Sequence, residues 1–224
     1  MVTTRGQLQE ALGYRFRDEE LLERALTHRS VGASNNERLE FLGDAVLGLV
    51  ISEALYHRFP RVEEGDLSRL RAHLVKRERL AEVAQELSLG ELLHLGGGER
   101  KSGGRRRDSI LADAVEALLA AVYLDGGYGA AHELVERLFE SRIRALPEPE
   151  ALKDPKTRLQ EHLQGQGAQR PEYRLIEEQG EAHSRQFHVL CQLPDQSLRV
   201  EGFGRSRRQA EQAAARAALD RLNS

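Results

Sequence analysis

Five acidic side chains lie in two apolar stretches of the sequence, at spacings typical of metal ligands on helices. In the first stretch Glu37, Glu40 and Asp44 stand at positions i, i+3 and i+7, which places them on one stripe of a helix. In the second stretch Asp113 and Glu116 lie one turn apart among apolar residues. Burying a carboxylate costs free energy unless it is paired. The sequence therefore predicts that a further positive charge neutralises these acids.

The types of ligand narrow the choice of that charge. All five side chains are carboxylates, with no histidine or cysteine at ligand spacing, and the immediate sequence offers only Arg38 as a counter-charge. Oxygen-only ligation suits Mg²⁺ or Mn²⁺ and argues against zinc. Such an ion can activate a water molecule and stabilise the charge that develops on a phosphodiester. The acids thus predict a divalent-metal site for phosphate chemistry.

Two structural explanations of the acids remain open at this point. Ser34 to Glu37 has the form of a capping box, in which Glu37 reaches back to the start of the helix. The other acids could be paired or capped within a purely structural helical domain. Charged residues are seldom buried unless they are paired or bind a metal, which disfavours the second explanation.

The stretches that carry the acids are expected to be buried helices. Apolar residues recur at spacings of three and four between Leu8 and Ala145, with hardly any strand-like alternation. Asn36 to Ile51 is apolar nearly all round, so we expect it to be buried. The second helix should run from about Asp108 to Leu124, with Gly126 and Gly127 stopping it.

The pattern changes after Leu146 to Glu150, where two prolines and two acids predict a linker. A short helix over 155–164, three strands and a closing helix follow. The closing helix carries small residues on one stripe that suit close packing on a sheet. These are Ala210, Ala213, Ala214, Ala217 and Ala218. The predicted fold is an all-α domain followed by a small α+β domain of order α-β-β-β-α.

Composition excludes several classes of protein. The chain of 224 residues carries a net charge of -3, with 12 basic and 10 acidic residues after position 150. Cys191 is the only cysteine, so an internal disulfide is excluded and a reducing compartment fits best. No stretch has the apolar length of a membrane span, and we expect a cytoplasmic protein. Arg100 stands where a Walker loop needs glycine before Lys101 and Ser102, which excludes that nucleotide site.

These motifs resemble those of bacterial ribonuclease III along nearly the whole chain. Glu37 to Leu47 resembles the signature helix of that family, and Ala25 to Ser30 precedes it as in the family. The block Gly98 to Gly104, leading into Asp108 to Leu118 and Tyr123 to Gly127, resembles the second hallmark. The signature often has serine where Ala45 stands, which is not a ligand position.

The resemblance assigns roles to the acids. It implies a catalytic metal cluster that holds Mg²⁺, with Mn²⁺ able to substitute, and in which Asp44 and Glu116 are the catalytic residues. The cluster consists of Glu40, Asp44, Asp113 and Glu116. Glu37 and Glu64 match acids that line the cleavage valley of the family. A solvated loop acid remains the alternative for Glu64, because it lies between Pro60 and Gly65.

The resemblance also implies an activity and its partners. It predicts hydrolysis of double-stranded RNA to 5′-phosphate and 3′-hydroxyl ends, by a homodimer that processes ribosomal RNA precursors and structured mRNAs. Residues 1–146 would form the nuclease and dimerisation domain, 147–152 the linker and 153–224 the RNA-binding domain. The competing class is a non-catalytic RNA-binding protein, which the intact set of acids disfavours.

Lys153 to Leu222 resembles a double-stranded RNA-binding domain, which contacts 2′-hydroxyls and phosphates across successive grooves. The resemblance places RNA contacts on the first helix, in the turn between the first two strands, and at the start of the last helix. The predicted contacts are Thr157, Gln160, Glu161, Gln164, His183, Arg205, Ser206, Arg207 and Arg208. A generic domain often has a further lysine where Glu211 stands, so we expect a weaker phosphate clamp here.

Overall fold

The computed structural model describes residues 4–147, 153–180 and 185–222. The chain divides into two compact units, Met1–Pro149 and Glu150–Ser224. Within the described residues, no helix combines the length and the apolar character needed to cross a bilayer.

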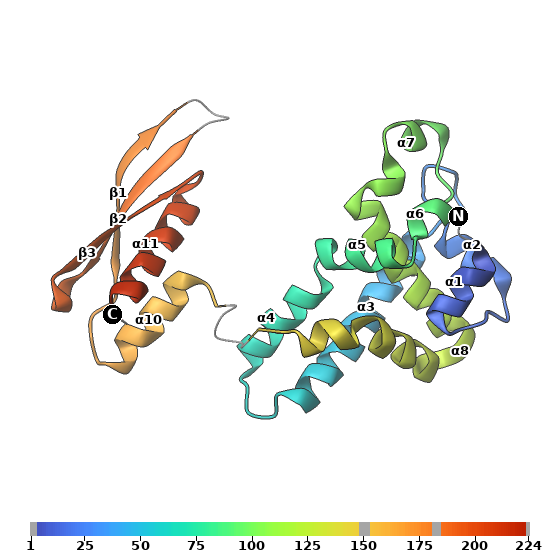
Figure 1. Cartoon of the computed structure of the whole chain (residues 1–224), viewed down its shortest axis with the longest axis horizontal. Coiled ribbons are helices and arrows are strands. Elements are labelled where there is room, and N and C mark those ends of the chain that lie inside the picture. Colours follow the sequence, from blue (N-terminus) through green and yellow to red (C-terminus); the bar gives the residue numbers. More distant parts are fainter. Residues whose placement is uncertain (1–3, 148–152, 181–184, 223–224) are drawn as a thin grey trace. The chain divides into compact units, whose positions relative to one another are not determined.

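The first unit is all helical, as the spacing of apolar residues predicts (Figure 1). Its longer helices are α1 (Arg5–Leu12), α2 (Glu19–Ala25), α3 (Glu37–Arg58), α4 (Glu64–Val75), α5 (Arg77–Glu86) and α8 (Asp108–Arg144). The shorter ones are α6 (Leu89–Leu92), α7 (Gly97–Lys101) and the 3-10 turn η1 (Gly104–Arg106). The glycine-rich loop of the sequence therefore contains a short helix, α7.

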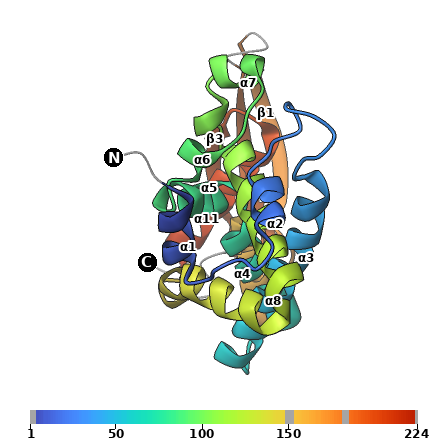
Figure 2. The ribbon, with the colours of Figure 1, turned by 90° about the vertical axis from the view of Figure 1, so that its right-hand side faces the viewer.

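The core of this unit is the packing of α3 against α8, and α5 covers α8 from another side (Figures 1 and 2). The two main helices touch at Gly43, where a Cβ atom would lie 1.8 Å from the backbone oxygen of Glu116. Only glycine allows this approach. Because Glu40 and Asp44 flank Gly43, the contact brings the acids of α3 against those of α8.

Helix α8 is broken at Gly127, where φ is 81° and ψ is -178°. This backbone conformation favours glycine, since other residues meet steric clashes at positive φ. Helical residues resume after this kink, so Gly127 ends the first helical segment of α8 and a second segment follows it. The predicted stop at Gly126 and Gly127 is therefore confirmed at Gly127, after which a second helical segment continues to Arg144.

Helix α3 is not buried all round, which corrects our expectation for Asn36 to Ile51. Leu39, Leu47 and Ile51 are buried, but Phe41 is 82% exposed and Leu49 is 57% exposed. The sequence pattern alone does not distinguish an apolar side that packs within the chain from one that stays open.

The second unit is an α+β domain in the predicted order. Its elements are α10 (Pro155–Gly165), β1 (Glu172–Gln179), β2 (Gln186–Leu193), the 3-10 turn η2 (Pro194–Gln196), β3 (Leu198–Gly204) and α11 (Arg207–Leu222). The strands form an antiparallel sheet of order β1-β2-β3. Both helices lie on the same side of this sheet (Figure 1).

Close helix-to-sheet packing explains the alanines of α11. A Cβ atom on Gly202 of β3 would lie 2.2 Å from the backbone nitrogen of Ala214, so helix and strand touch directly. Ala214 and Ala218 are buried as predicted, whereas Ala213 and Ala217 are only half-buried. The buried side is therefore rotated slightly from the predicted stripe.

Candidate functional site

Three of the predicted acids meet between α3 and α8. Glu40, Asp113 and Glu116 each offer a carboxylate oxygen, and these oxygens all lie within 4.8 Å of one another. All three residues are partly buried. Oxygen ligands at this spacing suit a hard divalent cation such as Mg²⁺.

The raised pKa of Glu116 shows why a cation would stabilise these grouped carboxylates. Burial and, after it, the repulsion from the carboxylates of Asp44, Glu40 and Asp113 together raise the pKa of Glu116 to about 8. Both causes act against the charged form. A bound dication would reverse the balance, because it favours the ionised carboxylates.

Glu40 and Asp113 are shifted in the same direction. Burial raises the pKa of Glu40, with Asp113 and Glu37 adding to the rise and Arg29 opposing it. Burial also raises the pKa of Asp113, although Arg77 and His28 oppose the shift. All three groups therefore hold protons more tightly than free carboxyl groups do.

Asp44 and Glu37 lie beside this grouping. Asp44 is exposed and close enough to raise the pKa of both Glu116 and Glu40. We call Glu40, Asp44, Asp113 and Glu116 the acid cluster.

The side chain of Glu37 pairs with Arg29 across 3.4 Å, and its backbone N–H donates to Asn35. Helix α3 begins at Glu37 without a side-chain cap, so the capping-box alternative is wrong.

Sequence reasoning missed the cations near the acid cluster. Only Arg38 lay close in sequence, whereas Arg29 and Arg77 are the arginines that act on Asp113. Arg77 opens α5, which packs against α8, and it precedes Asp113 by 36 positions. No local pattern could reveal this proximity, because it depends on how the helices pack.

His28 is buried and braces the segment before α3. Its Nδ1 accepts hydrogen bonds from the backbone N–H of Ser30 at 3.2 Å and lies 2.8 Å from the Ser30 Oγ. The same Oγ accepts from the N–H of Gly96 at 2.9 Å. These contacts join the segment before α3 to Gly96, which directly precedes α7, so packing is a sufficient role for His28.

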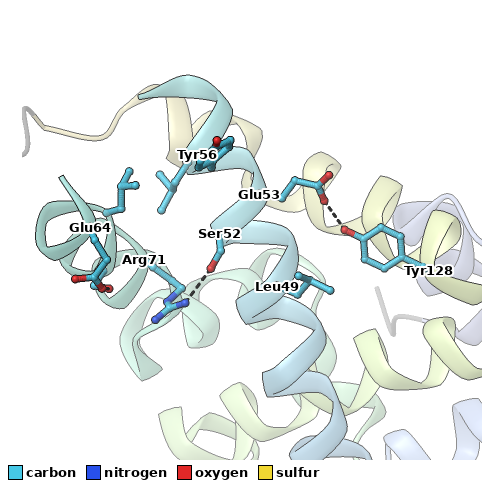
Figure 3. A pocket seen from close by; sticks show the side chains of 10 residues that line it. Leu49, Ser52, Glu53, Tyr56, Glu64, Arg71 and Tyr128 are labelled. Atoms are coloured by element: carbon cyan, nitrogen blue, oxygen red, sulfur yellow. Dashed lines mark hydrogen bonds between the residues drawn. The ribbon is translucent and has the colours of Figure 1, made fainter. Parts of the chain in front are cut away.

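Glu64 lies away from the acid cluster of its own chain. It opens α4 and accepts a hydrogen bond from Ser68 at 2.7 Å. It lines a groove of about 630 Å³ with Leu49, Ser52 and Tyr56. Arg71 donates to Ser52 at 2.9 Å in this groove (Figure 3). Ser52 follows Glu40 by 12 positions on α3, which is about 18 Å along a helix.

The groove belongs to an exposed apolar surface. Tyr128 of α8 donates a hydrogen bond to Glu53 of α3 at its edge (Figure 3). Five large apolar side chains of these two helices are open to solvent. They are Phe41 at 82%, Leu49 at 57%, Tyr56 at 68%, Leu124 at 51% and Tyr128 at 39% exposed. We call these five residues the apolar face.

The predicted RNA contacts on α10 share an accessible side of that helix. Thr157, Glu161 and Gln164 are exposed, and Gln160 is half-buried. Glu161 also forms an ion pair with Lys153 at 2.7 Å. The arrangement leaves polar groups free to approach a nucleic acid, while the buried Leu159 holds the opposite side of the helix in the core.

The arginines predicted as RNA contacts at the start of α11 are open to solvent. They are Arg205, Arg207 and Arg208. The Ser206 hydroxyl already accepts from the N–H of Gln209 at 3.2 Å, which caps the helix. His183 lies outside the described residues.

Both units of the chain are similar to known protein families. Residues 18–142 match the family described as Ribonuclease-III-like, and residues 155–222 match the double-stranded RNA binding motif. The chain is 55% identical over 222 residues to Ribonuclease 3 of Alkalilimnicola ehrlichii, covering 99% of this chain and 97% of that protein. It is 53% identical over 217 residues to Ribonuclease 3 of Proteus mirabilis, covering 97% and 96%.

The helical unit also resembles a solved structure. This is the nuclease domain of ribonuclease III from Campylobacter jejuni, described as showing structural flexibility in a region involved in dimer formation. The two are 45% identical with a TM-score of 0.61, and the match covers 63% of this chain and 99% of that one. Near-full-length identity above 50% and matches in both units lead to one conclusion. The chain belongs to the ribonuclease III family.

Proposed function

We propose that the acid cluster is the Mg²⁺ site with which this endoribonuclease cuts double-stranded RNA. The observation that carries the proposal is the convergence of three carboxylate oxygens within 4.8 Å on half-buried side chains. When bound, the ion polarises the phosphodiester and activates the attacking water, and Mn²⁺ can take its place.

The reaction is a hydrolysis at phosphorus. Oxygen from water forms a bond to phosphorus, and the bond from phosphorus to the 3′ oxygen breaks. The 3′ oxygen leaves as a hydroxyl with a proton that derives from the water, and the other strand end keeps the phosphate at its 5′ oxygen. Asp44 and Glu116 are the residues that we propose to act on the attacking water and to hold the ion that would contact the phosphate, while Glu40 and Asp113 complete the set of ligands.

The second unit supports binding of the duplex. Its α10 side and the arginines at the start of α11 provide groups for 2′-hydroxyls and for phosphates. We divide the chain into a nuclease domain (1–146), a linker (147–152) and an RNA-binding domain (153–224). Structured cytoplasmic RNAs, with ribosomal precursors first among them, are the proposed substrates.

The apolar face supports a homodimer. Exposed apolar side chains of this size on neighbouring helices are typical of interaction surfaces. Phe41 lies on the same stretch of α3 as Glu40 and Asp44, so a symmetric contact through this face would bring two acid clusters toward one duplex. Glu64 lines the groove together with Leu49 and Tyr56 of the apolar face. Because it lies away from the acid cluster of its own chain, a second copy is needed for Glu64 to approach a cleavage valley.

A single substitution tests the dimer. Phe41→Glu places a charge in the proposed interface and should convert the protein to monomers in analytical ultracentrifugation, with a large loss of cleavage. Phe203→Glu is the matched control, because Phe203 is also exposed, at 62%, but belongs to the second unit. A Phe41→Glu protein that remains dimeric would exclude the apolar face as the interface.

The cleavage test uses a radiolabelled RNA hairpin with Mg²⁺, with and without EDTA, and compares the parent with Glu116→Gln. We expect cutting that requires both the metal and Glu116, with RNA binding retained in the variant. The loss of rate should be about 10³-fold or more, since a metal site supplies several kcal/mol of transition-state stabilisation. Binding without cutting by the parent, in both Mg²⁺ and Mn²⁺, would favour the non-catalytic class.

A further inference from the structure

Glu211 is a half-buried acid inside the proposed phosphate-binding site of the second unit. Its side chain is 14% exposed, and it lies on α11 four residues after Arg207, the first residue of that helix. It pairs with the ammonium group of Lys156 at 2.5 Å and with the Nε of Arg207 at 3.0 Å. One carboxylate therefore engages two cations at the end of the domain where phosphates are expected to bind.

These ion pairs hold Glu211 in its charged form. Burial alone would raise its pKa, but hydrogen bonds from Lys156 and Arg207 outweigh burial and lower the pKa below its usual value. The two cations are correspondingly engaged. Lys156 also lies over the ring of Tyr173, 4.5 Å from its centre, which further fixes its position.

The other two cations at this site are less restrained. Arg208 is 82% exposed, and its contact with Asp154 spans 3.8 Å. Arg205 is exposed, and its backbone N–H donates to Gln209. Ion pairs at such separations and exposures contribute little. Arg205 and Arg208 can therefore turn toward a phosphate at low cost, whereas Arg207 and Lys156 must first leave Glu211.

The ion pairs are not needed to dock α10 on α11. Leu159 and Leu163 of α10 are buried in one core with Ala214 and Ala218 of α11. Apolar burial of this kind supplies most of the packing free energy of a small domain. The principal effect of Glu211 should therefore be on the charge that the domain presents to RNA.

We propose that Glu211 weakens the grip of this domain on RNA by engaging Arg207 and Lys156 in internal ion pairs. This proposal rests on the proposed function of the second unit. A weaker grip suits an enzyme that must release its cut duplex, because product release limits turnover in many enzymes. Glu211 thus sets a balance between substrate affinity and turnover.

The test measures binding of the full-length chain to an RNA duplex of about 16 base pairs, the span of one such domain. EDTA prevents cleavage, and the salt concentration is varied. In Glu211→Gln the freed cations should tighten binding. They should also steepen the plot of log association constant against log salt by about 0.9 for each further phosphate contacted, and thus by about 0.9 to 1.8.

Glu201→Gln is the matched control for net charge. Glu201 lies on β3 and pairs with His188 at 3.0 Å, so its substitution leaves the ion pairs of Glu211 in place. This variant changes the total charge by the same amount and should keep the salt dependence of the parent. If both variants tighten binding equally, the effect comes from total charge and the proposal is wrong.

Combining substitutions isolates the released cation. Arg207→Gln should cost more binding in the Glu211→Gln background than in the parent, because only there is Arg207 free. Under multiple turnover, kcat of Glu211→Gln should fall relative to its single-turnover rate. Equal affinity and salt dependence of parent and Glu211→Gln, or weaker binding by the variant, would overturn the proposal. A parent that does not bind the duplex would overturn the proposed function instead.

Discussion

Two glutamates in this chain occupy partly buried sites and differ in what neutralises them. Glu116 lies among other acids, and its pKa is raised to about 8 by burial and by Asp44, Glu40 and Asp113. Glu211 is held between Lys156 and Arg207, and its pKa is lowered because these hydrogen bonds outweigh burial. Every cause that shifts the pKa of Glu116 raises it, so a bound cation would relieve the repulsion, whereas Glu211 already has two cations beside it.

The role of a buried acid depends on which charges surround it. A carboxylate with its own cations is a finished ion pair, which stabilises the fold modestly and removes charge from the surface. A carboxylate among like charges stores repulsion that a ligand can relieve. Such clusters are therefore candidates for function, as perturbed pKa values at active sites generally are.

The largest expected effect comes from separating the helices that form the acid cluster. Gly43→Ala places a methyl group against the Glu116 backbone, so α3 and α8 must move apart. We expect a loss of about 1–3 kcal/mol in the free energy of unfolding, measured in urea, as for other overpacked cores. Cleavage should fall about 10²-fold, because misplacement by about 1 Å can cost that much.

The control for this substitution is Gly129→Ala. Gly129 also lies in a helix, and a Cβ atom there meets nothing within 4 Å. Alanine is favoured over glycine in helices, so this variant should be as stable as the parent or more so. Full cleavage by Gly43→Ala would show that the close approach at Gly43 does not set the geometry of the acid cluster.

The next prediction concerns the sign of the change in the free energy of unfolding when Glu116 or Glu211 is replaced. At pH 8 without metal, Glu116→Gln should raise the free energy of unfolding, because it removes repulsion among buried acids. Glu211→Gln should lower it, because Lys156 and Arg207 lose their partner. Each change should be about 1 kcal/mol or less, since both sites are partly open to water. Urea unfolding of the two variants and the parent measures these changes. Shifts of the same sign would contradict the difference that we draw between Glu116 and Glu211.

The smallest expected effect is a pH dependence of stability. The folded chain keeps a proton on Glu116 up to about pH 8, whereas the unfolded chain loses it near 4.5, the ordinary pKa of glutamate. The stability from this group is therefore fully present below the unfolded pKa and is lost as the pH rises toward 8. The metal-free parent should lose a few degrees of Tm relative to Glu116→Gln between about pH 5 and 8.

Mg²⁺ should oppose this loss, because it binds the ionised acids. The stabilisation by Mg²⁺ should accordingly be larger at pH 8 than at pH 6. Thermal melts of both proteins at each pH, with and without Mg²⁺, measure the effect. Parallel melting curves for parent and Glu116→Gln at every pH would contradict the raised pKa.

Much of this architecture could be predicted from sequence, because the relevant signals are local. The spacing of Glu40 with Asp44 and of Asp113 with Glu116 indicates shared helix faces. The alternation in β2 and the alanines of α11 indicate the second domain. Neither prediction needs knowledge of tertiary contacts.

The remaining features depend on tertiary packing. Arg77 reaches Asp113 because α5 packs on α8, and Gly43 matters because α3 touches α8 there. Glu211 had a recognisable departure from a generic lysine, but its pairing with Lys156 across two helices had no sequence signal. The exposure of Phe41 was missed because an apolar pattern does not reveal which side lacks a partner within the chain.

Direct measurement of metal binding can establish whether the acid cluster is the metal site. Isothermal titration of Mn²⁺ at pH 8 would compare the parent, Glu116→Gln and Glu211→Gln. We expect similar Mn²⁺ affinities for the parent and Glu211→Gln, with affinity weaker by at least about tenfold in Glu116→Gln, as for loss of a metal-site contact. Equal Mn²⁺ binding by Glu116→Gln and the parent would contradict the assignment of the acid cluster as the metal site.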